Sequence, residues 1–251
     1  MDVPALSIII PAFNEARRLG HTLELVRAWV MRTGRSVELI VVDDGSTDTT
    51  AEIVRQHASE PPAVQLLTNP VNRGKGYSVA RGMLAARGAR VLMCDADLST
   101  PIEEIDKLWT WLDQGFDVVI ASRDLPDSHL DPPQPRLRRW AAWLFRALRR
   151  RLLLPELRDT QCGFKLFTRA AAQAIFARQT LHGWLFDCEA LGLAERLGYR
   201  VKEVGVIWRH RTHSRVRPLR EALVAVPTLL AIRRRLARLE QTDRLHLGRG
   251  F

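Results

Sequence analysis

The sequence predicts an α/β fold built around a mainly parallel sheet. Apolar, strand-like runs alternate with amphipathic segments of helix length through the first half of the chain, and we find no internal repeat. Strands that alternate with helices of this size form parallel sheets with right-handed crossovers. We expect strands at 6–10, 37–42, 63–68, 90–94 and 116–121, and helices at 15–33, 48–58, 74–87 and 102–114.

The second half is more mixed. Residues 123–135 are polar and rich in proline, which predicts a loop. Residues 136–154 place tryptophan and leucine on one helical face and arginine on the other, which predicts a basic amphipathic helix. Beyond it we expect a strand at 160–168, helices at 169–179 and 186–197, a strand at 200–208 and a helical tail from Pro218 to about Glu240. We therefore assign a domain to residues 1–217 and a basic amphipathic tail to residues 218–251.

The composition limits the class of protein. A chain of 251 residues with 46% hydrophobic residues can bury a full core. The cysteines Cys94, Cys162 and Cys188 lack zinc spacing and indicate reduced thiols in the cytoplasm. No signal peptide is expected, and every apolar run is shorter than the roughly 20 residues that span a bilayer. The net charge of +10, concentrated in 136–158 and 196–249, favours partners that carry phosphate.

Two carboxylates, Asp95 and Asp97, follow the predicted strand at 90–94. Open α/β sheets bind ligands at the carboxyl ends of their strands. A few carboxylates, completed by substrate phosphates, are typical of Mg²⁺ or Mn²⁺ sites. Asp97 is the predicted metal ligand, and Asp95 contacts either a ribose or the metal through water. The alternative is a solvated acidic pair.

Two other predicted strands also end in polar residues. The first runs into Pro11, Ala12, Phe13, Asn14 and Glu15, which can hold a flat base and a ribose hydroxyl. The alternative is the acidic first turn of a helix.

The second strand ends in Asp43 and Asp44, which can accept hydrogen bonds from a base or ribose. The alternative is an Asx turn leading into a capped helix, which explains Asp48.

Two basic residues complete the predicted edge. Lys75 lies in Asn72-Arg73-Gly74-Lys75-Gly76, directly before a helix, where amides and a lysine suit phosphate. The spacing differs from a Walker loop, and an ordinary loop is the alternative. Arg123 follows the strand at 116–121 and can clamp a diphosphate through two parallel hydrogen bonds.

Together these residues resemble the family-2 inverting glycosyltransferases of the GT-A fold, over about residues 5–215. Within that family the chain is similar to dolichyl-phosphate β-glucosyltransferases and related polyprenyl-phosphate enzymes. The discriminating segments are 159–167, 183–189, 204–208 and 214–216.

The resemblance implies a nucleotide-binding half at about 1–125 and an acceptor half at 126–217. The implied nucleoside contacts are Pro11, Phe13, Glu15 and Asp44, and the implied diphosphate and metal contacts are Asp95, Ala96, Asp97 and Arg123. Phe13 stands where the family usually has Tyr, which keeps a stacking face. Ser99 stands where mannosyl relatives often have Gln, which weakens an assignment to GDP-mannose.

The resemblance also places Asp159 on the acceptor side. A lipid phosphate is already an anionic nucleophile, so alignment and leaving-group stabilisation can carry the reaction. Asp159 then orients the sugar or the acceptor, and it acts as a base if the acceptor is a hydroxyl. Asp187 and Glu189 are weaker candidates.

The Arg-rich helices have two interpretations. Helix 136–154 and tail 219–238 lie on a membrane surface, or their apolar faces pack against the domain. A lipid-phosphate acceptor favours the membrane, with Arg136, Arg139 and Arg215 as candidates for binding the acceptor phosphate.

We therefore expect inverting transfer of a hexose, glucose from UDP-glucose, to dolichyl or undecaprenyl phosphate. The protein is expected to be cytoplasmic and peripheral at a membrane face. The alternatives are a GDP-mannose donor, a soluble hydroxyl acceptor, a nucleotidyltransferase and a nucleic-acid-binding module. A nucleotidyltransferase would need a Gly-rich loop where Pro11 to Phe13 stand. No base-reading motif or aromatic interleaving is present, so we expect no nucleic acid partner.

Overall fold

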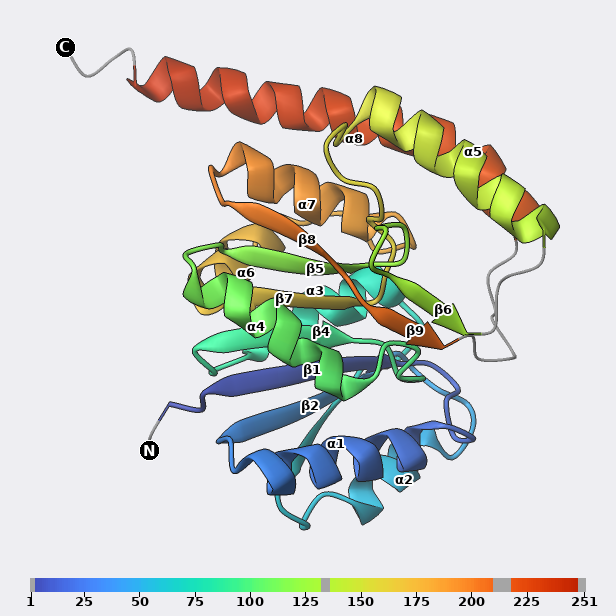
Figure 1. Cartoon of the computed structure of the whole chain (residues 1–251), viewed down its shortest axis with the longest axis vertical. Helices are drawn as coiled ribbons and strands as arrows, with labels where there is room; N and C mark the ends of the chain where they lie inside the picture. Colours follow the sequence, from blue (N-terminus) through green and yellow to red (C-terminus); the bar gives the residue numbers. More distant parts are fainter. Residues whose placement is uncertain (1–2, 132–135, 210–217, 248–251) are drawn as a thin grey trace.

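A seven-stranded sheet forms the centre of the protein (Figure 1). The computed structural model describes residues 3–131, 136–209 and 218–247, and the side chains among them except those of 136–142, 218–223 and 240–247. The strand order is β3-β2-β1-β4-β7-β5-β8. The strands are β1 (Leu6–Ala12), β2 (Val37–Asp43), β3 (Val64–Thr68), β4 (Arg90–Cys94), β5 (Val118–Ser122), β7 (Phe164–Thr168) and β8 (Val201–Gly205). All neighbours are parallel except β7, which is antiparallel to both β4 and β5. The predicted α/β fold with a mainly parallel sheet is confirmed.

Helices cover both faces of the sheet and bury two apolar cores. They are α1 (Leu19–Thr33), α2 (Thr50–Gln56), α3 (Lys75–Ala85), α4 (Ile105–Asp113, after the 3-10 turn Ile102–Glu104), α6 (Arg169–Phe176) and α7 (Phe186–Arg196). Along β1, Ile8 and Ile10 enter the core under α1 and α4, while Ile9 enters the core under α3, α6 and α7. This alternation is what a strand buried on both faces requires.

Two long helices lie side by side on the outer side of α7, α5 (Arg136–Leu152) and α8 (Pro218–Leu247) (Figure 1). α8 adds Leu229, Ile232 and Leu236 to the core that α7 lines. A Cβ at Gly192 of α7 would lie 2.5 Å from Leu236, so the two helices are in close contact. Within the described residues, none of the helices combines the length and apolar character needed to cross a bilayer.

The structure corrects several expected boundaries. The segment 123–135, expected as a loop, contains the short strand β6 (His129–Asp131), which pairs with β9 (Ile207–Arg209). The expected strand at 200–208 is therefore divided between two sheets, with the break at Val206. The expected strand at 160–168 begins only at Phe164, and α8 continues past Glu240 to Leu247.

The sheet directs its functional residues to one edge. Strands β1, β2, β4 and β5 run parallel, so their carboxyl ends lie at the same edge. β7 runs the other way, so its beginning lies there too. Residues that follow four strands and residues that precede a fifth are thus brought together.

Candidate active site

Asp95 and Asp97 leave the end of β4 on one tight turn. The turn closes with a 3.1 Å hydrogen bond from the Leu98 amide to the Asp95 carbonyl, and Leu98 has a φ of 45°. The Asp95 carboxylate lies 2.6 Å from the Lys75 ammonium, and the Asp97 carboxylate lies 3.5 Å from the Arg18 guanidinium. Both side chains are partly exposed, at 32% and 24%. The turn therefore presents two accessible carboxylates, each beside a cation.

Gly163, directly before β7, makes room for Asp95. Its carbonyl accepts a 2.9 Å hydrogen bond from the Asp95 amide. A Cβ at this position would lie 1.8 Å from the Asp95 Oδ2 atom. A side chain at 163 would therefore displace the carboxylate.

The residues present fit a hard divalent cation. Carboxylate oxygens are the ligands that Mg²⁺ and Mn²⁺ prefer, and the two cations already beside Asp95 and Asp97 show that positive charge is favoured here. Burial opposes the charge on Lys75, but the carboxylates of Asp95 and Asp187 raise its pKa above the ordinary value. The described residues include no group of three His, Cys, Asp or Glu placed to hold a metal. Substrate phosphates or water would have to complete the shell.

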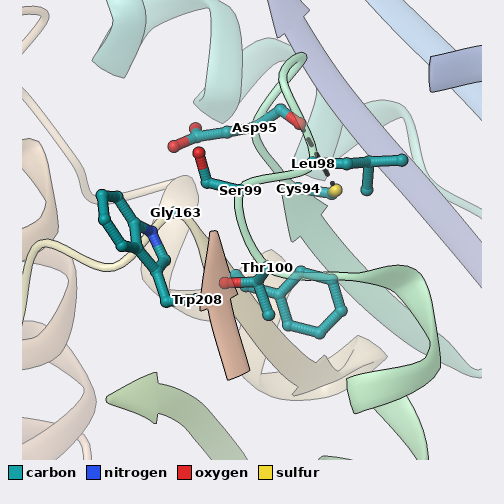
Figure 2. Close-up of a pocket in the computed structure, with 8 residues that line it drawn as sticks. Cys94, Asp95, Leu98, Ser99, Thr100, Gly163 and Trp208 are labelled. Carbon is teal, nitrogen blue, oxygen red and sulfur yellow. Dashed lines mark hydrogen bonds between the residues drawn. The ribbon is translucent and has the colours of Figure 1, made fainter. Parts of the chain in front are cut away.

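A small hollow opens beside the turn (Figure 2). In this view the Asp95 carboxylate and the Ser99 hydroxyl point the same way, and the indole of Trp208 lies beside them. The lining residues are Cys94, Asp95, Leu98, Ser99, Thr100, Gly163, Phe164 and Trp208. The end of β4, the beginning of β7 and β9 thus enclose one space at the edge of the sheet.

The predicted nucleoside residues lie at the same edge. The Asp44 amide donates a 2.8 Å hydrogen bond to the Ala12 carbonyl, so the ends of β1 and β2 are adjacent. Pro11 and Phe13 are half-buried there, whereas Ala12 and Ala96 are buried.

Several of these polar groups bind other protein groups. The Asp43 carboxylate accepts a 3.1 Å hydrogen bond from the Ser46 amide, and Glu15 binds the Arg18 guanidinium with two bonds of 2.7 Å. The Asp44 carboxylate accepts from the Asn69 side chain at 2.7 Å and from the Arg73 and Gly74 amides at 2.9 and 2.8 Å. Asp44 therefore fixes the loop that carries Lys75.

A close backbone contact, which the sequence did not reveal, requires glycine on both sides of Lys75. A Cβ at Gly74, where φ is 98°, would lie 2.5 Å from the His182 carbonyl oxygen, and one at Gly76 would lie 2.5 Å from that of Leu181. The Gly76 amide donates a 2.7 Å hydrogen bond to the His182 carbonyl. This amide at the beginning of α3 thus has a protein partner, and Lys75 is the group directed at Asp95.

Asp159 and Arg123 form a buried ion pair on the other side of the site. Arg123 donates from Nε at 2.6 Å, from its terminal nitrogen at 2.9 Å and from its backbone amide at 3.1 Å. Asp159 is 2% exposed. Burial opposes its ionisation, but the Arg123 guanidinium outweighs burial and holds the pKa of Asp159 well below its usual range. The same pairing raises the pKa of Arg123.

Glu203 on β8, which sequence reasoning missed, holds the backbone on which Asp159 stands. Its two carboxylate oxygens accept from the Arg158 amide at 2.8 Å and from the Asp159 amide at 2.6 Å. Sequence alone offered no signal, because Glu203 lies 44 residues from Asp159.

Asp187 and Glu189 diverge, as two residues one apart on a helix must. Asp187 pairs at 2.6 Å with Lys165, a buried lysine inside the segment 159–167 that was not singled out. Burial raises the pKa of Asp187. Glu189 accepts from both the amide and the hydroxyl of Thr180 and pairs with Arg235 of α8. Both carboxylates are thus bound by protein groups.

The predicted acceptor-phosphate residues are not placed. The side chains of Arg136 and Arg139, and residue Arg215, lie outside the described part of the protein. On the described part of α5, Trp143 and Leu144 are 58% and 49% exposed.

Comparison with solved structures defines the class. Glucosyl-3-phosphoglycerate synthase from Mycobacterium tuberculosis in complex with UDP matches with a TM-score of 0.67 and 22% identity, over 93% of this chain and 80% of that one. A structure of the same protein with Mn²⁺, UDP-glucose and glycerol 3-phosphate matches over 91% and 78%, also with a TM-score of 0.67. The fold is that of the GT-A glycosyltransferases.

Sequence comparison defines the family. Residues 7–176 match the glycosyl transferase family 2 domain. The chain is 34% identical over 240 residues to the dolichyl-phosphate beta-glucosyltransferase of Dictyostelium discoideum, covering 91% of this chain and 73% of that protein. It is 32% identical to the human dolichyl-phosphate beta-glucosyltransferase, covering 96% and 80%. The chain belongs to glycosyl transferase family 2 and is a glycosyltransferase, which confirms the predicted resemblance.

Proposed function

We propose that this protein transfers glucose from UDP-glucose to a polyprenyl phosphate, with inversion, at the cytoplasmic face of a membrane. The observation that carries the proposal is the extent of the likeness to dolichyl-phosphate beta-glucosyltransferases. The family domain ends at residue 176, whereas the likeness covers 91% and 96% of the chain. It therefore includes α7 and also β8, whose Glu203 holds the backbone of Asp159.

On the donor side, Asp97 would hold Mg²⁺ or Mn²⁺, and Asp95 would contact it directly or through water. The bound metal supplies charge neutralisation for the departing diphosphate. Pro11, Phe13, Glu15, Asp43 and Asp44 hold the nucleoside. Phe13 offers a half-buried ring for stacking, and Glu15 a carboxylate for a ribose hydroxyl.

The positive charges of Lys75 and Arg123 suit the negatively charged diphosphate. Lys75 lies 2.6 Å from Asp95, and Arg123 follows β5 at the same edge. Each carries a permanent positive charge, because neighbouring carboxylates raise the pKa of both side chains. Lys75 can stabilise negative charge that develops on the leaving group, and Arg123 can add to this from its fixed place beside Asp159.

The acceptor side favours a phosphate over a hydroxyl. A hydroxyl acceptor needs a base, and an efficient base has a pKa near the working pH. The pKa of Asp159 is well below its usual range, because its carboxylate is bound by Arg123. Asp159 therefore orients the sugar or the acceptor through Arg123, and it is a weak proton acceptor. A polyprenyl phosphate is already ionised and needs only alignment.

The α5–α8 pair provides the membrane surface in this proposal. Trp143 and Leu144 on α5 and Val224 and Val226 on α8 are exposed, and both helices are rich in arginine. Apolar side chains next to arginines are typical of helices that lie at the boundary between lipid tails and phosphates. Arg136, Arg139 and Arg215 are the proposed contacts to the acceptor phosphate.

The test is transfer of label from radioactive UDP-glucose to undecaprenyl or dolichyl phosphate in detergent, with Mn²⁺ or Mg²⁺. We expect label in the lipid phase only when metal and lipid are both present, and an acid-labile product of β configuration. Transfer from GDP-mannose instead would contradict the donor. Transfer to a soluble hydroxyl with none to lipid would contradict the acceptor and the membrane surface.

A further inference from the structure

Trp184 lies on the segment between α6 and α7 and reaches the donor side of the site. We propose that its indole is the platform on which the hexose ring of the sugar nucleotide stacks, so that Trp184 distinguishes a sugar nucleotide from the bare nucleotide. This inference rests on the proposed function and names a further binding residue for its donor.

The segment that carries Trp184 is docked firmly on α3. The His182 carbonyl accepts from the Gly76 amide at 2.7 Å, and the Gln179 side chain donates to the Gly76 and Leu181 carbonyls at 2.9 and 2.8 Å. The absence of side chains at Gly74 and Gly76 allows this close approach. The segment thus lies against the beginning of α3, where Lys75 is directed at the site.

A second set of contacts holds the segment from behind. The Glu189 carboxylate accepts from the Thr180 amide at 3.0 Å, the Thr180 hydroxyl at 2.7 Å and the Leu181 amide at 2.7 Å. Glu189 also pairs with Arg235, whose guanidinium donates to the Arg178 carbonyl at 2.6 Å. The backbone that leads to Trp184 is therefore fixed before a ligand arrives, and α7 begins two residues after it, as a rigid stacking surface requires.

Trp184 itself lies near the Asp95 carboxylate, with Lys75 between them. The Lys75 ammonium lies 4.9 Å from the centre of the indole and 2.6 Å from the Asp95 carboxylate, so it bridges the two. Trp184 as a whole is 37% exposed. A large aromatic ring is thus accessible to a ligand, and only the Lys75 ammonium separates it from Asp95 at the proposed diphosphate site.

The chemistry of a hexose suits this ring. A pyranose ring presents C–H groups on one face, and an aromatic face carries partial negative charge that attracts them. Binding sites combine such apolar surfaces with a few polar groups that fix orientation. Asp95 and Lys75 supply the polar groups next to Trp184, and the sugar is attached to the diphosphate that they would bind.

The experiment measures the binding of UDP and of UDP-glucose by calorimetry in the presence of Mn²⁺. For Trp184→Ala we expect the Kd of UDP-glucose to rise about tenfold, while the Kd of UDP changes less than about twofold. Trp184→Phe keeps an aromatic face and should restore most of the affinity for UDP-glucose. Gly183→Ala is the matched control, because a Cβ there meets no atom within 4 Å, and both constants should stay unchanged.

Other outcomes would contradict the proposal that Trp184 binds the hexose. If Trp184→Ala weakened the binding of UDP and of UDP-glucose equally, Trp184 would only cover Lys75. If it weakened the binding of neither, Trp184 would not contact the donor. If the wild-type protein binds a different sugar nucleotide, the same comparison is made between that ligand and its own nucleotide. Binding of UDP-glucose with no transfer to lipid would contradict the proposed function and leave the platform intact. A wild-type protein that binds no sugar nucleotide would overturn both.

Discussion

The two sides of the site use acid–base pairs of opposite character. On the proposed donor side, Asp95 and Asp97 are about a third and a quarter exposed, and Asp97 meets Arg18 only at 3.5 Å. On the proposed acceptor side, Asp159 is 2% exposed and receives two side-chain hydrogen bonds and a backbone bond from Arg123. The first side holds its cations in partly exposed pairs, one of them as short as 2.6 Å, whereas the second holds its cation against a buried carboxylate.

This difference indicates which side can exchange its partner. A partly exposed pair contributes little to stability, because water screens it, so a lysine can move aside when a metal and a diphosphate arrive. A buried pair cannot be separated without leaving an uncompensated charge in the interior. Asp95 and Asp97 are therefore accessible to a ligand, and the pair of Asp159 and Arg123 is a fixed part of the framework.

The largest effect is expected from Asp97→Ala. Loss of a metal ligand should reduce transfer at least about 100-fold, which corresponds to roughly 2.7 kcal/mol of lost stabilisation of the transition state. Stability to urea should change little, because the side chain is partly exposed and accepts one local hydrogen bond, from the Ser99 amide. The checks are the lipid-transfer assay and a urea titration. Full activity in this variant would remove Asp97 from the metal site.

Asp159→Asn, in contrast to Asp97→Ala, should lower the stability of the protein strongly. The change leaves the Arg123 guanidinium partly buried without its countercharge, and breaking such a pair costs about 3–5 kcal/mol of folding free energy. The free energy of unfolding from urea titration is the measurement, with Asp97→Asn as the matched control on the exposed side. An Asp159→Asn protein that is inactive but as stable as the wild type would instead give Asp159 a direct chemical role.

Gly163→Ala should separate the position of Asp95 from its charge. A Cβ 1.8 Å from the Asp95 Oδ2 atom must displace that carboxylate, although both donor carboxylates remain in the chain. We expect the concentration of Mn²⁺ needed for half-maximal transfer to rise by about tenfold, with a loss of stability of about 1–3 kcal/mol from overpacking. An unchanged requirement for Mn²⁺ would show that the exact place of Asp95 does not matter to the metal.

The smallest effect concerns pH. The folded pKa of Asp159 is lowered by Arg123, so this pair contributes its stability above the unfolded value of about 3.9 and loses it as the pH falls toward the folded value. The difference in urea midpoint between the wild type and Asp159→Asn should therefore be constant from pH 8 to about pH 5 and shrink below about pH 4. A difference that titrates between pH 5 and 7 would contradict the lowered pKa.

Local patterns predicted most of the fold, and long-range pairing accounts for the errors. β1, β2 and β4 were predicted because their apolar runs are continuous. β6 was missed because three residues in a Pro-rich segment carry no period, and its partner β9 lies far along the chain. The first residues of the expected helix 15–33 instead form a turn, in which the backbone amides of Asn14 and Glu15 donate to the side chains of Ser46 and of Thr50 at the beginning of α2.

The residues of the site likewise divide into those that local pattern predicted and those that depend on long-range pairing. The positions of Asp95, Asp97 and Arg123 after strands were enough to place them at one edge. The pairing of Arg123 with Asp159 was not predictable, because it depends on β7 entering the sheet backwards between β4 and β5. Nor did spacing reveal that Gly74 and Gly76 serve a contact with residues 181 and 182.

The reversed direction of β7 has a consequence for engineering. β5 ends and β7 begins at the same edge, with Ile120 opposite Lys165, so the whole segment 123–163 leaves the sheet and returns at neighbouring points. Segments whose ends are adjacent can be exchanged with little disturbance to the rest of a domain. An exchange of this segment for a relative's version therefore needs only two junctions, but the graft must keep the pairing of β6 with β9, the packing of α5 on α8 and the bond from the Asp159 amide to Glu203.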